Sequence, residues 1–128
     1  GDTAVIFQGS NAVHLGDVFN NAGYPFIDAG NGGGLEGLIE FCKQTLLNID
    51  EDTVVIPGHG PVTDYKALSD YIEMLSVIRD RMMALIDEGK SLKEVYAAKP
   101  TADFDEKMGD NSGFINRAYM SLTHKRTY

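Results

Sequence analysis

Positive charge and long apolar runs are scarce in this sequence, and each scarcity excludes a class of protein. The 128 residues carry 11 lysines and arginines against 19 aspartates and glutamates, a formal net charge of −8. An acidic chain is repelled by phosphate backbones, so we do not expect it to bind nucleic acid. No apolar run approaches the roughly 20 residues of a membrane-spanning helix, so we do not expect membrane insertion.

Cysteine occurs once, as Cys42, which excludes a disulfide within the chain and a metal site built from several cysteines. We interpret Cys42 as a small buried apolar residue on a helix. The cysteine content is compatible with a reducing cytoplasm but does not identify the compartment. No signal peptide is visible after Gly1, and the start on glycine is compatible with a processed product or a fragment.

The residues that are present have the composition of a folded domain. Hydrophobic residues make up 43% and charged residues 23% of the chain, as in ordinary globular proteins. Apolar, β-branched segments predict a strand at residues 3–8, a turn at 9–11, a second strand at 12–15 that ends at Gly16-Asp17, and a third at 53–56 that Pro57 breaks. The glycine-rich stretch 20–34 is expected to be a long loop.

Apolar residues at three- and four-residue spacing predict the helices. One covers residues 35–47, and a long one begins at a cap on Thr63 or Asp64 and ends at Gly89. Ser91 with Glu94 predicts a capping box for a short helix through residue 98, and a last helix is expected over about 113–123. Methionines 74, 82 and 83 are assigned to helix packing, and residues 100–113, with their acidic side chains, to a solvated loop. The sequence thus predicts a single α/β domain over residues 1–128, a small mixed sheet covered by helices.

Two segments place a metal-binding residue type directly after an apolar strand. These are Gly16-Asp17 and Pro57-Gly58-His59-Gly60, and sites in α/β proteins usually form at such strand ends. A carboxylate and an imidazole together suit zinc, iron or manganese. Each residue also has a plain structural interpretation, Asp17 as a turn or cap carboxylate and His59 as a turn histidine. The glycines at 32–34 resemble a phosphate cradle but lack the lysine and hydroxyl residue of a P-loop.

Taken together, these two segments resemble the metallo-β-lactamase superfamily. The resemblance extends to NAVHLGDVFNNAGYPFIDAGNGGGLEGL at residues 11–38 and to SLKEVYAAKPTADFD at residues 91–105, so it covers nearly the whole chain. It implies that Asp17 is the carboxylate that bridges two metal ions and that His59 is the last histidine ligand. It also implies a fold in which this chain is the C-terminal half of an αββα sandwich.

The family's His-x-His-x-Asp-His motif is absent from this chain, whose only histidines are His14, His59 and His124. Of the family's ligands the chain retains Asp17 and His59, whereas a catalytic zinc site needs about three protein ligands. The resemblance implies zinc or another divalent metal in the parent family, and it does not require that this chain binds a metal by itself. His14 and Asp28 are candidates for orienting the ligands. Metal binding and packing are the alternatives for His14, and helix capping is the alternative for Asp28. No catalytic residue is assigned.

Three functions remain open at this point. In the first, the chain is the C-terminal portion of a metal-dependent hydrolase and is inactive without the N-terminal half. In the second, it is a hydrolase whose site is rebuilt across a dimer. In the third, it is a non-catalytic interaction domain that kept the fold. The parent family cleaves small molecules, among them lactams, thioesters, phosphoesters and lactones, and the sequence does not choose between them. A lone half-sandwich would expose an apolar sheet face, so we expect a homo-oligomer, in its simplest form a symmetric dimer.

Overall fold

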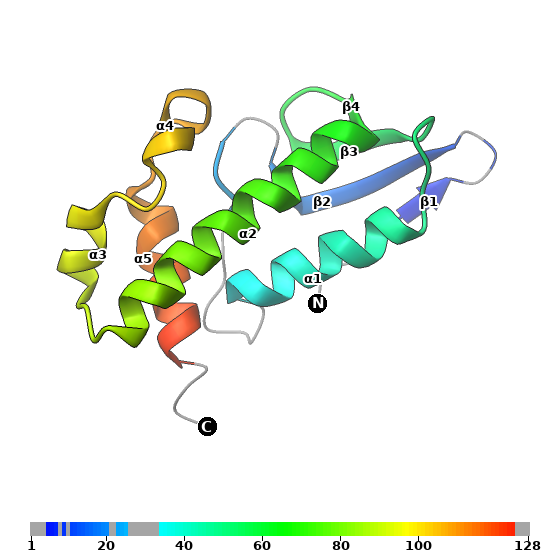
Figure 1. The fold of residues 1–128 in the computed structure, drawn as a ribbon. Coiled ribbons are helices and arrows are strands. Elements are labelled where there is room, and N and C mark those ends of the chain that lie inside the picture. The colour runs from blue at the N-terminus through cyan, green and yellow to red at the C-terminus, as the bar shows by residue number, and fades with distance from the viewer. Residues whose placement is uncertain (1–4, 8, 10, 21–22, 26–33, 125–128) are drawn as a thin grey trace.

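The computed structural model describes residues 5–7, 9, 11–20, 23–25 and 34–124, and the side chains of Asp17, Val18, Asn20, His59 and His124 are not among the parts it describes. It confirms the α/β class, with a small mixed sheet covered by helices (Figure 1). In chain order the elements are β1 (Val5–Phe7), β2 (Ala12–Asn20), α1 (Gly34–Leu47), β3 (Val54–His59), β4 (Thr63–Asp64), α2 (Tyr65–Asp87), α3 (Leu92–Ala98), α4 (Ala102–Met108) and α5 (Ser112–His124).

The sheet has the strand order β1-β2-β3-β4. β1 and β2 form the expected antiparallel hairpin, in which Val5 lies opposite His14 and Phe7 opposite Ala12. β2 and β3 are parallel. Parallel neighbours need a crossover connection, which α1 provides here. The short β4, which the sequence did not predict, pairs antiparallel with the start of β3.

Both central strands run further than expected. Gly16 does not end β2, because the glycine adopts a left-handed backbone with φ of 61° and the pairing to β3 shifts register there. A glycine of this kind marks a bulge within a strand rather than its end. Likewise β3 continues through Pro57 to His59. Proline, which lacks an N–H, is tolerated because β4 pairs only with Val54 and Val55 and leaves this later part of β3 without a partner on that side.

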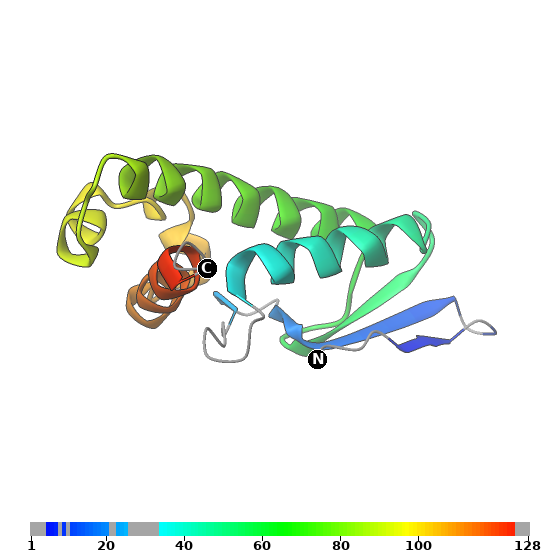
Figure 2. The ribbon, with the colours of Figure 1, turned by 90° about the horizontal axis from the view of Figure 1, so that it is seen from below.

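Helices α1 and α2 lie side by side on one face of the sheet (Figure 2). The strand residues that face them are fully buried, among them Val13, Leu15 and Val55. They meet the apolar stripes of the two helices, which include Ile39 and Cys42 of α1 and Leu75 of α2. The interpretation of Cys42 as a buried apolar residue is confirmed.

The opposite face of the sheet is not covered by any helix of the described part of the chain (Figure 2). Registers place Val5, Phe7, Ala12, His14, Val54 and Ile56 on this open face, because paired residues project to the same side. Val5, Phe7 and Val54 remain 46%, 48% and 41% exposed. Apolar side chains of this size, grouped on one face, are typical of an interface.

The structure confirms the helix caps and the buried methionines that the sequence predicted. Of the two residues proposed as the cap of α2, Asp64 is the one that accepts a hydrogen bond from the Ala67 N–H, at 2.9 Å. The capping box of α3 forms, with the Ser91 and Glu94 side chains each bonded to the other residue's backbone N–H. Met74 and Met82 are buried in the core, as expected for helix packing.

The α1–β3 connection is tied to the β1–β2 turn by three polar side chains. Asn11, which holds a left-handed conformation with φ of 46°, donates from its side-chain amide to Asp50 at 3.3 Å. The Thr53 hydroxyl donates to the side-chain oxygen (Oδ1) of Asn11 at 2.9 Å. The donors around Asp50, first of all Asn11, lower the pKa of its carboxyl. These bonds fix the entry of β3 beside β2.

Residues 102–108, expected to be a solvated loop, form the helix α4. Together α3, α4 and α5 gather around the end of α2 that lies farthest from β1 (Figure 1). Arg81 of α2 ties α4 to the rest, since its guanidinium donates to the Pro100 carbonyl at 3.1 Å and to Asp103 at 2.8 Å. The same guanidinium lies 5.9 Å from the centre of the Phe104 ring. None of the described helices is long and apolar enough to cross a membrane.

Candidate functional site

The parallel pairing of β2 and β3 brings the two segments singled out in the sequence to one edge of the sheet. Gly16 pairs with Pro57, and Asn20 pairs with His59. Asp17 therefore follows the first of these pairs on β2, and His59 belongs to the second on β3. Both residues lie in the carboxyl-terminal parts of neighbouring parallel strands, where ligand sites in α/β sheets form.

The side chains of Asp17 and His59 lie outside the described parts of the structure. Among the residues whose side chains are described, no group of three or more histidine, cysteine, aspartate or glutamate side chains could hold a metal ion. The backbone thus places two residues of the ligand types that zinc takes on adjacent strands, and the assignment of these two residues as ligands stays a prediction.

His14 lies on the open face of the sheet and is exposed. Its Nδ1 atom accepts a hydrogen bond from the Gly16 N–H at 3.1 Å. This bond occupies one ring nitrogen and fastens the histidine to the bulge that precedes Asp17. The hydrogen bond stabilises the backbone of β2 just before Asp17. The role of His14 in orienting a metal ligand stays a prediction.

Asp28 and the glycines at 32 and 33 lie outside the described residues. The described start of α1 shows one contact that the sequence did not predict: the Leu35 N–H donates to the Ser121 hydroxyl of α5 at 3.2 Å. A Cβ atom at Gly34 would come within 3.1 Å of the Ser121 Cβ. Glycine at position 34 therefore allows α5 to approach the first turn of α1 closely.

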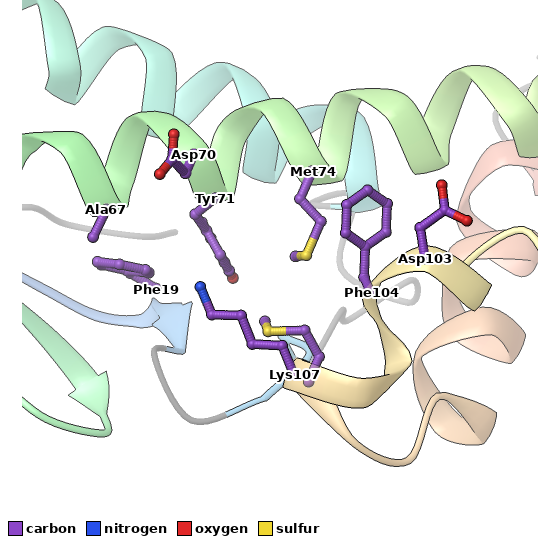
Figure 3. A pocket seen from close by; sticks show the side chains of 9 residues that line it. Phe19, Ala67, Asp70, Tyr71, Met74, Asp103, Phe104 and Lys107 are labelled. Atoms are coloured by element: carbon purple, nitrogen blue, oxygen red, sulfur yellow. The ribbon is translucent and has the colours of Figure 1, made fainter.

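A pocket of about 270 Å³ opens between α2 and α4, next to the end of β2 (Figure 3). Its wall is mainly apolar, with Phe19 from β2, Tyr71 and Met74 from α2, and Phe104 and Met108 from α4. The Phe19 and Tyr71 rings pack at a centroid distance of 4.7 Å. Phe19 follows Asp17 by two residues, about 7 Å along a strand, so the pocket adjoins the edge where Asp17 and His59 lie.

The polar side chains that line this pocket are Asp70, Asp103 and Lys107. Both carboxylates have cationic partners, Asp70 with Lys66 at 2.9 Å and Asp103 with Arg81 at 2.8 Å. Figure 3 shows the Lys107 side chain reaching across the opening toward Tyr71. Lys107 forms no ion pair with the described residues, unlike the two carboxylates.

A partly buried group of hydrogen bonds supports the α4 wall of the pocket. Asp105 accepts from the Tyr24 hydroxyl at 2.6 Å, from the Thr101 hydroxyl at 2.8 Å and from the Asn111 amide at 2.7 Å. The Tyr24 ring also stacks on Phe114 of α5 at a centroid distance of 4.8 Å. Burial, and then the hydrogen bond to Asp105, raise the pKa of Tyr24 well above its ordinary value. Tyr24 is thus a neutral donor.

Sequence reasoning missed both the pocket and the role of Asp105. It assigned Asp103, Asp105 and Glu106 to a solvated loop, which is wrong for Asp105. The available signal was weak: Phe104 and Met108 lie four residues apart, as on one face of a helical turn, and Thr101 precedes them as a possible cap. The partners Tyr24 and Asn111 lie 81 and 6 residues away from Asp105 in sequence, a pairing that no local pattern reveals.

Comparison with models of protein families finds none that matches this chain, and a search of curated proteins finds no match either.

Proposed function

We propose that this chain is the C-terminal portion of a metal-dependent hydrolase of the metallo-β-lactamase type, with Asp17 and His59 as its contribution to the metal ligands. The observation that carries the proposal is the parallel register of β2 and β3, which sets the two residues in the end regions of adjacent strands. The motifs Gly16-Asp17 and Pro57-Gly58-His59-Gly60 add the ligand types. Zinc bound there would supply a hydroxide nucleophile.

The residues present fit a metal only in part. A carboxylate and an imidazole are suitable zinc donors, but a catalytic zinc needs about three protein ligands. The proposal therefore requires further ligands from a segment outside these 128 residues, and it holds that the chain has no hydrolase activity alone. The contribution of this chain is to fix the spacing of two ligands through the sheet and through the bulge at Gly16.

The open sheet face supports the same proposal. One face of the sheet is packed by α1 and α2, and the other presents Val5, Phe7 and Val54 to solvent. A half-sandwich has this asymmetry, because its second face is meant to meet another sheet. The alternative of a non-catalytic interaction domain draws on the same face, and the two functions differ in whether His59 matters for chemistry.

The test uses the polypeptide encoded together with the sequence that precedes Gly1, assayed with zinc against ester, thioester and lactam substrates. We expect turnover that the 128-residue chain lacks. His59→Ala should lower it at least hundredfold, because the metal loses a ligand. His124→Ala, which removes a histidine from α5, is the matched control and should retain activity. Unchanged turnover in His59→Ala, or a preceding sequence without His-x-His-x-Asp-His, would refute the proposal.

A further inference from the structure

The pocket between α2 and α4 has the features of a ligand site of its own. Small-molecule sites are concave and mostly apolar, with a few polar groups that fix the ligand's orientation. Here aromatic rings and methionines from three elements form the wall, and the charged side chains that line it are Asp70, Asp103 and Lys107 (Figure 3). The volume of about 270 Å³ limits the occupant to a small molecule. An apolar cavity of roughly 150 Å³ already takes up benzene, so a single ring with a short substituent fits.

The charged side chains that line the pocket determine which polar group a ligand can carry. Asp70 and Asp103 are compensated by Lys66 and Arg81, whereas Lys107 has no ion-pair partner among the described residues. A bound anion would complete this arrangement, and a bound cation would meet an unopposed ammonium group. The chain as a whole is acidic, with a net charge of −8, and its overall field disfavours anions. Lys107 is the side chain of this pocket that would attract an anion locally.

We propose that this pocket binds a small apolar carboxylate, with the ring or short chain between Phe19, Met74 and Met108 and the carboxylate at Lys107. This binding goes beyond the proposed hydrolase function and needs no metal. Tyr71 and Phe104 then form the sides of the site, and the Arg81 contacts to Pro100 and Asp103 hold α4 at the required distance from α2.

The test compares three probes that share a ring and a linker and differ in head-group charge: 3-phenylpropanoate, 3-phenylpropanol and 3-phenylpropylamine. Each is titrated into the chain labelled with ¹³C at the methionine methyls, in the presence of a chelator. Met74 and Met108 line the pocket, whereas Met120 is exposed on α5. We expect 3-phenylpropanoate to shift the Met74 and Met108 signals at lower concentration than the other probes, while Met120 stays unchanged.

Lys107→Met tests the role of the charge, because methionine keeps most of the side-chain length and Lys107 is exposed. An exposed ion pair contributes up to roughly fivefold in affinity. We therefore expect Lys107→Met to weaken 3-phenylpropanoate binding about fivefold and to leave 3-phenylpropanol binding unchanged. Lys93→Met, an equal change of charge on α3 away from the pocket, should alter neither. Equal binding of all three probes, no shift at Met74 and Met108, or a carboxylate preference that survives Lys107→Met would each overturn the proposal.

Discussion

Asp105→Ala is expected to lower the free energy of unfolding by about 3 kcal/mol. The carboxylate accepts hydrogen bonds from Tyr24, Thr101 and Asn111, which come from three separate places in the chain. Alanine would leave the Tyr24 hydroxyl without its short acceptor in a partly buried setting, and Thr101, which is fully buried, without its acceptor. Buried polar groups without partners cost about 1–3 kcal/mol each, so the loss exceeds that of an ordinary surface change.

Urea denaturation followed by circular dichroism measures this effect, and α4 supplies the control. Asp103→Ala removes a carboxylate of the same helix whose partner, Arg81, lies with it at the surface. Exposed ion pairs contribute about 1 kcal/mol or less, so this variant should be only slightly destabilised. Tyr24→Phe, which deletes one donor and keeps the ring stacked on Phe114, should fall between the two. Equal losses for Asp103→Ala and Asp105→Ala would show that the hydrogen-bond group does not support α4.

Phe7→Glu is expected to weaken self-association of the chain at least hundredfold. We propose that two copies pair through their open sheet faces, on which Val5, Phe7 and Val54 are about half exposed. A two-fold symmetric pair uses the same surface on both copies, so one substitution enters the interface twice. A carboxylate buried among apolar side chains loses its hydration without gaining a partner, which costs several kcal/mol.

Light scattering at micromolar concentration measures the association. The chain is expected to behave as a dimer and Phe7→Glu as a monomer of unchanged circular dichroism, since residue 7 is exposed in the single copy. Met120→Glu adds the same charge to another exposed apolar residue, on α5 and away from the sheet, and should remain dimeric. A monomeric parent chain, or equal effects of the two variants, would exclude pairing through the sheet face.

Local signals in the sequence predicted most of the fold. Helix α2 is specified by the Asp64 cap and by apolar residues such as Leu68, Leu75 and Ile78, which recur on one face and are buried. The capping box of Ser91 and Glu94 specified α3 in the same way. These signals act within a few residues of chain, so the sequence alone suffices to find them.

The missed features depend on contacts between distant segments. Gly16 was interpreted as a strand end because glycine allows both a turn and a bulge, and only the pairing of β2 with β3 decides between them. The helix α4 is held by the packing of Phe104 and Met108 against the core. It is also held by bonds from Arg81 and Asn111, which come from outside the helix. The candidate metal ligands needed both kinds of information. The sequence motifs singled out Asp17 and His59, and the pairing of β2 with β3 shows that they lie on adjacent strands.

Asp17 and His59 are proposed to bind one metal together with ligands from the preceding segment, so zinc is titrated into the ¹⁵N-histidine polypeptide encoded together with the sequence that precedes Gly1. His14, His59 and His124 are the three histidines of the 128 residues, and the ring signals of His59 and His124 are assigned from the His59→Ala and His124→Ala variants. We expect zinc to shift the ring nitrogens of His59 and to leave those of His124 in place, and we expect Asp17→Asn to weaken this response at least tenfold. A His59 ring that does not respond to zinc, or that responds equally with and without the Asp17 carboxylate, would exclude a metal shared by the two residues.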